Sequence, residues 1–274
     1  MKYLQVTDTV VLLNNDFGAN ISCIALKDEL FYIDTSMNTT IAADFRKEME
    51  QKFNCPSTEL IITHGHIDHL FGIGAFKGLD VIVAEDSKPR FERFVNTEYT
   101  EEVIANISRV FPFFRESVKS ANLFMPNIWV KDQMNINEEI LFQVVGGHSA
   151  CSSTIFYKPD KMLFVGDLVQ YNSYPYFGEP DNDMFKWIAN LKKWEELDID
   201  IFIPGHGIPF NKIYLKKVRI FFEELVAFLK EMKQQKIPEE EVPYHPNFPK
   251  GYWDETAVRR PPFDFSVKNL YRIL

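Results

Sequence analysis

The stretch ELIITHGHIDHLFGIG, residues 59–74, constrains the fold more than any other part of the sequence. An apolar run of strand length, residues 59–63, is followed at once by three of the chain's six histidines within six positions, with an aspartate among them. A buried strand that ends in such a cluster places titratable groups where loops gather at the edge of a rigid scaffold, the usual position of binding and catalytic residues. The other strands of the chain must complete that scaffold.

Strand-like and helix-like segments follow one another in two blocks. The first block predicts short strands and a hairpin over 8–34, a helix over 38–53 capped by Asn38 or Thr39, and strands over 59–63 and 80–84. The second predicts strands over 139–145, 152–157, 162–166 and 199–204, a helix over 181–197 and a long amphipathic helix over about 211–235. Two sheets packed face to face, with helices outside, satisfy this order and predict an α/β fold class.

Two segments fall outside the alternation. Residues 86–125 are helical in period and rich in phenylalanine, and we expect one or two inserted helices, with Pro112 as a break. Such helices could pack on the core, cover a site as a lid or form a dimer face. The tail, about 236–274, holds six prolines and is predicted to be irregular. We expect residues 1–274 to form a single domain.

Charge and cysteine usage restrict the partners. A formal net charge of −9 repels a nucleic-acid backbone, so nucleic acid is disfavoured as a partner and a small-molecule substrate is expected. The three cysteines are widely separated, and the N-terminal residues lack the layout of a secretory signal. No apolar run approaches the ~20 residues of a membrane span. We therefore expect a cytoplasmic protein with reduced thiols that does not bind membranes, and a homodimer stays open.

The cluster itself, His64-Gly65-His66-Ile67-Asp68-His69, is typical of a metal site. Four groups of ligand type on six residues are too many for one tetrahedral ion with an open position, so the spacing suggests two adjacent ions. Three further residues follow apolar strands in the same way: His148 in VVGGHSACSS, Asp167 in MLFVGD and His206 in IDIFIPGHG. His245, in VPYHPNFP, lies outside this set.

This succession of motifs resembles the metallo-β-lactamase superfamily. The resemblance covers most of residues 8–210 and implies an αββα sandwich of two mixed β-sheets with flanking helices. It implies that His64, His66 and His148 bind a first ion, that Asp68, His69 and His206 bind a second, and that Asp167 bridges the two. Zn²⁺ suits this donor set best, with Fe or Mn as alternatives.

The sequence departs from the common family pattern in two places. The early strand ends in Asp34-Thr35-Ser36 where DTG is usual, and the fourth motif is GHSACS, residues 147–152, where GHTxGS is frequent. Cys151 is predicted to be a small buried thiol and not a ligand. Three tyrosines close behind Asp167 could donate to a substrate oxyanion or simply pack as an aromatic loop: Tyr171, Tyr174 and Tyr176.

Two ions about 3.5–4 Å apart can share a water and lower its pKa towards neutrality, which supplies a bridging hydroxide nucleophile. We predict a metallo-hydrolase of an ester, a thioester or a lactone, in which Asp68 also orients the nucleophile and is a catalytic residue. The first alternative is an oxidoreductase like those relatives that oxidise thiol persulfides with a single iron. The second is a phosphodiesterase or ribonuclease of the same superfamily, and the third is a catalytically silent binding protein. Fold alone does not decide among them.

Overall fold

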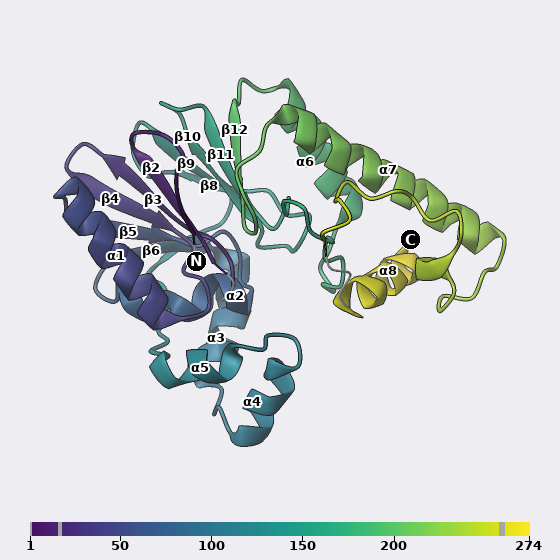
Figure 1. Ribbon diagram of the computed structural model, residues 1–274, viewed down its shortest axis with the longest axis horizontal. Helices are drawn as coiled ribbons and strands as arrows, with labels where there is room; N and C mark the ends of the chain where they lie inside the picture. The colour runs from purple at the N-terminus through teal and green to yellow at the C-terminus, as the bar shows by residue number, and fades with distance from the viewer. Residues whose placement is uncertain (1, 16–17, 258–260) are drawn as a thin grey trace. The chain divides into compact units, whose positions relative to one another are not determined.

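The computed structural model describes residues 2–15, 18–257 and 261–274 (Figure 1). The chain divides into two compact units, Met1–Met134 and Asn135–Leu274. Each unit carries one mixed β-sheet and its own helices, so the predicted fold class of two mixed sheets with flanking helices is confirmed. The prediction that the whole chain acts as one domain stays a prediction. Among the residues that the structure describes, no helix combines the length and the apolar character needed to cross a membrane.

The first unit is built on a seven-stranded sheet whose order follows the sequence, β1-β2-β3-β4-β5-β6-β7. Its strands are β1 (Lys2–Gln5), β2 (Val10–Asn14), β3 (Ile21–Leu26), β4 (Glu29–Ile33), β5 (Ser57–Ile61), β6 (Asp80–Ala84) and β7 (Ile128–Val130). Strands β1 to β4 pair antiparallel, whereas β4, β5, β6 and β7 pair parallel. Parallel strands end at the same edge of a sheet, so the residues after β4 and those after β5 lie side by side.

Helix α1 (Thr39–Phe53) follows the sheet's fourth strand and begins where the sequence predicts. The side chain of Asn38 accepts hydrogen bonds from the backbone N–H groups of Thr40 and Ile41, which caps the helix. Phe45 and Met49 lie on its buried face, at helical spacing. After β5 come the single-turn helix α2 (Ile67–Leu70) and the 3₁₀ helix η1 (Phe71–Phe76).

The segment 86–125 holds three short helices where the sequence predicts one or two. A 3₁₀ turn, η2 (Glu85–Ser87), is followed by α3 (Lys88–Asn96), α4 (Glu101–Ser108) and α5 (Phe114–Ser120). Phe91, Phe94 and Phe114 are buried in the core of the first unit, whereas Phe113 is exposed. The aromatic residues of this segment therefore serve mainly to fix its helices to the unit from which they project.

The second unit contains a five-stranded sheet in the order β12-β11-β10-β9-β8. Its strands are β8 (Gln133–Asn135), β9 (Ile140–Val144), β10 (Ser153–Tyr157), β11 (Met162–Gly166) and β12 (Ile201–Pro204). Strands β9, β10 and β11 are antiparallel, and β11 pairs parallel with β12. Helices α6 (Met184–Glu196) and α7 (Lys212–Gln234) lie side by side, and their apolar faces build the core of this unit (Figure 1).

The tail differs from the expected irregular segment. After α7 it forms only the 3₁₀ turn η3 (Val242–Tyr244) until residue 257, but helix α8 covers Pro261–Ile273. Two of the six tail prolines, Pro261 and Pro262, lie in the first turn of α8, where the missing N–H has no intrahelical partner to lose. Phe263, Val267 and Leu270 are buried at helical spacing in the core of the second unit.

Candidate metal centre

The cluster after β5 forms what we call the first half-site: His64, His66, Asp68 and His69. His64 leaves the strand, His66 precedes α2, and Asp68 and His69 lie in its only turn. Three of these residues, His64, Asp68 and His69, are buried. The rings of His64 and His69 lie 4.1 Å apart between centroids, so the imidazoles are gathered in one place within the first unit.

The carboxylate of Asp34 fixes two of these imidazoles. Its Oδ2 lies 2.8 Å from Nδ1 of His69. Oδ2 also accepts a hydrogen bond of 2.8 Å from the Thr63 hydroxyl, whose oxygen lies 3.1 Å from Nδ1 of His64. Because the hydroxyl hydrogen is committed to Asp34, the Thr63 oxygen is left to accept from His64. Both rings are then Nδ1–H tautomers with Nε2 as the lone-pair nitrogen, the form that binds a metal.

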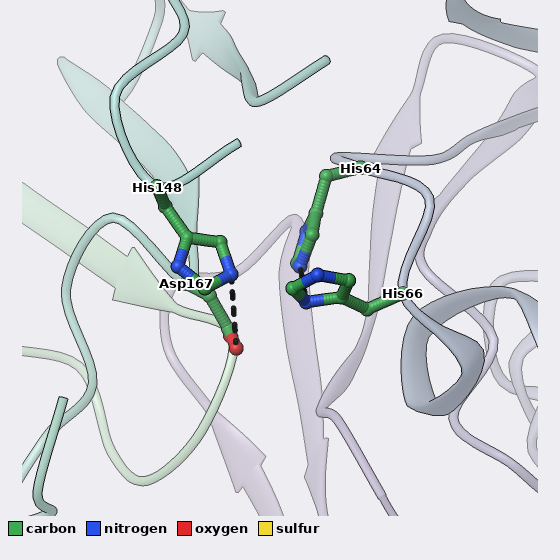
Figure 2. A group of neighbouring side chains, drawn as sticks. All are labelled: His64, His66, His148 and Asp167. Carbon is green, nitrogen blue, oxygen red and sulfur yellow. Dashed lines mark hydrogen bonds and ion pairs between the residues drawn. The ribbon is translucent and has the colours of Figure 1, made fainter. Parts of the chain in front are cut away.

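His66 directs its Nδ1, and not its Nε2, towards the Nε2 atom of His64. Nε2 of His64 and Nδ1 of His66 lie 2.9 Å apart, the contact marked between these rings in Figure 2. Two nitrogen ligands of a tetrahedral zinc ion lie about 3.3 Å apart when each Zn–N bond is ~2.0–2.1 Å. The two nitrogens therefore stand close to one edge of a coordination shell.

The second unit carries the second half-site, which we define as His148, Asp167 and His206. His148 follows β9 and β10 begins five residues later, in a turn that requires a positive φ at Gly146 and Gly147. A Cβ on Gly147 would lie 3.0 Å from the Cβ of Trp187, so a side chain there would displace the residue whose ring packs against His148. Nδ1 of His148 donates to the carbonyl of Tyr176 at 3.2 Å, which again leaves Nε2 as the lone-pair nitrogen.

Asp167 lies between the two histidines of the second half-site, His148 and His206. Its Oδ2 is 4.0 Å from Nε2 of His148, the ion pair drawn in Figure 2, and its Oδ1 is 3.5 Å from Nε2 of His206. Gln170 holds the carboxylate by a hydrogen bond of 2.7 Å from Nε2 to Oδ2. Asp167 is buried, whereas the side chain of His206 is 27% exposed. One carboxylate is thus within reach of ions held by either imidazole.

All seven predicted ligands lie at the ends of strands or in the turns after them, and each half-site is assembled within its own unit. The grouping of both halves around shared ions stays a prediction. His245 lies apart, where its Nδ1 accepts from the backbone N–H of Asn247. Cys151 is buried beside Ser149 and is absent from the candidate ligand groups of the described residues. The rings of Tyr171 and Tyr174 pack on other aromatic rings, and Tyr176 contributes its carbonyl to His148.

The donor set fits divalent transition metals. Imidazoles suit zinc and iron, and a minority of carboxylates offsets the charge of the ions. The buried carboxylate behind His69 and the carbonyl behind His148 are the outer partners that metal-bound histidines usually have. A set of histidines that served only as core packing would have no need of such uniform orientation.

Sequence reasoning missed three residues that shape these half-sites: Asp34, Thr63 and Trp187. Asp34 was noticed only as part of a departure from DTG, although its position after β4, next to the end of β5, could have suggested a contact with the cluster. Thr63 has no sequence signal of its own. Trp187 lies on α6, donates its indole N–H to the carbonyl of Leu168 at 2.8 Å and packs edge-on against His148.

Comparison with known proteins agrees with this architecture. Residues 130–206 match the family model described as "Metallo-beta-lactamase superfamily". The structure of the stereoselective inverting sec-alkylsulfatase Pisa1 from Pseudomonas sp. superposes with a TM-score of 0.76 and 16% identity, over 99% of this chain and 50% of that chain. A metallo-β-lactamase from Pontibacter korlensis superposes with a TM-score of 0.58 and 16% identity, over 81% of this chain and 98% of that chain. The chain thus has the metallo-β-lactamase fold.

A curated relative adds a sequence match. The 2,4-dinitroanisole O-demethylase subunit alpha of Nocardioides sp. (strain JS1661) is 24% identical over 179 residues, which are 64% of this chain and 48% of that protein. The chain spans about half the length of this relative and of the alkylsulfatase. The match over residues 130–206 and the shared fold agree with the resemblance to the metallo-β-lactamase superfamily that the sequence motifs indicate.

Proposed function

We propose that this chain is a metal-dependent hydrolase in which the two half-sites together hold a pair of divalent ions, with zinc as the first candidate. In this proposal one ion would be bound by His64, His66, His148 and Asp167, and the other by Asp68, His69 and His206. The Asp167 carboxylate lies 4.0 Å from His148 and 3.5 Å from His206, so it is the candidate for a bridging ligand.

The observation that carries the proposal is the fixed orientation of the imidazoles. The Nδ1 atoms of His64, His69 and His148 each face an acceptor in their own unit. Such outer partners set the tautomer and raise the basicity of the ligating nitrogen, and removing them typically costs 10–100-fold in metal affinity or activity. Together the three outer partners leave three buried Nε2 atoms with lone pairs available for a metal ion.

Bound ions would supply Lewis acidity and a water of lowered pKa, which is the chemistry of hydrolysis at neutral pH. The chain's own residues then have three tasks. The imidazoles hold the ions and the carboxylate of Asp167 offsets part of their charge. Asp68, buried in the turn of α2, would orient the attacking water, and for that reason we assign it the catalytic role.

We propose an ester, a thioester or a lactone as the substrate. An acidic chain with no general attraction for polyanions favours a small, partly apolar molecule over a nucleic acid. The names of the relatives widen the choice, because one acts on secondary alkyl sulfates and another demethylates 2,4-dinitroanisole. A useful panel therefore includes p-nitrophenyl esters, a thioester, a lactone, a secondary alkyl sulfate and 2,4-dinitroanisole.

The test combines metal analysis of protein purified without added metal with turnover of that panel. We expect about two equivalents of zinc per chain and turnover that a chelator abolishes. His148→Ala should lose at least one equivalent together with activity, whereas the control His245→Ala should keep both, because His245 lies outside the ligand groups of the described residues. One iron per chain, with oxygen uptake on a persulfide, would instead establish the oxidoreductase alternative.

A further inference from the structure

Tyr252, in the tail segment between α7 and α8, has an unusual position. Its hydroxyl oxygen is buried and has no hydrogen-bond partner among the described residues, although the residue as a whole is only half-buried. Leaving a buried hydroxyl unmatched is unfavourable, and most such groups in native proteins are paired. The orphaned hydroxyl therefore needs an explanation, and a partner supplied by a ligand is one.

The ring of Tyr252 is rigidly held. It makes edge contacts with Tyr214, Phe221 and Trp253, at centroid distances of 5.7, 5.7 and 5.2 Å. Three aromatic neighbours of this kind leave little freedom for rotation, so the place of the hydroxyl is fixed by packing within the second unit. A fixed hydroxyl can be selective for one position of a ligand atom, which a mobile one cannot.

The tail segment is attached to the loop that follows Asp167. Asn172 donates from Nδ2 to Oδ1 of Asp254 and to Oγ1 of Thr256, both at 3.0 Å, and its Oδ1 accepts from the backbone N–H of Asp254 at 2.8 Å. The backbone N–H of Asn172 in turn donates to the hydroxyl of Tyr214 at 2.7 Å. Gln170, two residues before Asn172 in the same loop, donates a hydrogen bond to the carboxylate of Asp167. These contacts attach the tail segment that contains Tyr252 to the loop that follows Asp167.

The electrostatic surroundings agree with this placement. Burial raises the pKa of Tyr252 well above its usual value, and the nearby Tyr214 hydroxyl and Asp167 carboxylate add to the rise. A phenol hydroxyl is both a hydrogen-bond donor and an acceptor.

We propose that Tyr252 is a substrate-binding residue, whose hydroxyl donates a hydrogen bond to an oxygen of the reacting ester group beside Asp167. The inference rests on the proposed hydrolytic function and names a residue of that same site. The proton stays on Tyr252 throughout, so the residue makes no covalent step. Its hydrogen bond positions the substrate and strengthens as negative charge develops on that oxygen.

The experiment compares Tyr252→Phe with the wild type in the zinc-loaded protein. Turnover is measured on the fastest substrate of the panel, and binding of butyrate, the carboxylate product of a butyrate ester, is measured by calorimetry. We expect kcat/KM to fall ten- to a hundredfold and butyrate to bind about tenfold more weakly, with unchanged zinc content. The melting temperature should stay the same or rise, because the variant removes a buried hydroxyl that has no partner in the protein.

Tyr271→Phe is the matched control. It also removes a tyrosine hydroxyl from the tail, but that hydroxyl donates to the carbonyl of Ile237 at 2.7 Å. This control should lower the melting temperature and leave turnover and butyrate binding unchanged, the opposite of the pattern expected for Tyr252→Phe.

The outcomes separate the two proposals. If the wild type turns over nothing in the panel, the hydrolase proposal fails, but weaker butyrate binding by Tyr252→Phe would still support the binding role. Equal butyrate binding by wild type and variant overturns the inference, whether or not the protein is a hydrolase. So does a wild type that binds no butyrate, or a variant whose melting temperature falls as far as that of the control.

Discussion

Asp34→Asn is the substitution that tests the metal centre most directly. Asp34 has a φ of 60°, a left-handed conformation that asparagine tolerates better than most residues, so the change should not strain the backbone. The replacement is also of equal size. What changes is the charge and one of two oxygens, which becomes an NH₂ group.

The structure sets the size of the effect. Oδ1 of Asp34 accepts from the backbone N–H of Thr63 at 2.8 Å, while Oδ2 faces Nδ1 of His69 and the Thr63 hydroxyl. If the amide nitrogen faces Thr63 N–H, His69 keeps its tautomer and zinc affinity should fall about tenfold. If it faces His69 instead, the tautomer is lost and the fall should approach a hundredfold. These limits correspond to about 1.4 and 2.7 kcal/mol of binding free energy.

The metal-free protein should also be destabilised, since either orientation breaks at least one hydrogen bond to a charged group, about 1.5–3 kcal/mol. Zinc affinity is measured by competition with a chromogenic chelator, and stability by urea denaturation after metal removal. Asp44→Asn, on the exposed face of α1, is the control and should change neither quantity. A zinc dissociation constant for Asp34→Asn within threefold of the wild-type value would refute the assigned role of Asp34.

Two further predictions concern pH and metal removal. Glu59 lies on β5 directly opposite Asp80 of β6, and burial, followed by the charges of Asp80 and Glu29, raises the pKa of Glu59 to about 7. Because the folded-state pKa of Glu59 lies above its unfolded value, the stability present below about pH 4.5 is lost as pH rises through 7. Glu59→Gln should reduce this loss of unfolding free energy by about 1 kcal/mol after solvent screening, in denaturation curves measured from pH 4.5 to 8. The same dependence of stability on pH in the variant as in the wild type would contradict the prediction. Dialysis of the zinc-loaded protein against dipicolinate should lower its melting temperature by several degrees, because only the folded state holds the ions. Adding zinc, but not magnesium, should restore the melting temperature. A melting temperature that does not change on chelation would show that the donor set holds no metal.

Much of the fold could be predicted because its local patterns are strong. Helix α1 has a side-chain cap and apolar residues at helical spacing, and β5, β10 and β11 are short apolar runs. The strands β1, β7 and β8 were not predicted, since three or four residues of mixed polarity form no periodic pattern. Helix α8 was missed for a different reason, because its two initial prolines normally indicate a break.

The candidate ligands could also be found from sequence, because each of them stands at the end of an apolar strand or just after it. Their outer partners could not. The contact of Asp34 with His69 depends on the parallel pairing of β4 with β5, a relation between segments about 30 residues apart that no local pattern encodes. Tyr252 is more remote still, since its relation to the loop after Asp167 depends on the contacts of Asn172 and Tyr214 with the tail.

The departure from DTG at residue 36 has a physical explanation in the first unit. Ser36 has a φ of 57°, a conformation that glycine adopts freely and serine does not. Its hydroxyl donates to Oδ1 of Asn15 at 3.1 Å, a buried contact that glycine could not make and that offsets the strain. Between the two strained residues, Asp34 and Ser36, Thr35 donates its hydroxyl and its backbone N–H to the carbonyl of His69, at 2.8 and 2.9 Å. Strain of about 1–3 kcal/mol per residue persists only where the surroundings enforce it. Here the strained segment places Asp34 against the ring of His69 and Thr35 against its backbone carbonyl, so it fixes both parts of a predicted metal ligand.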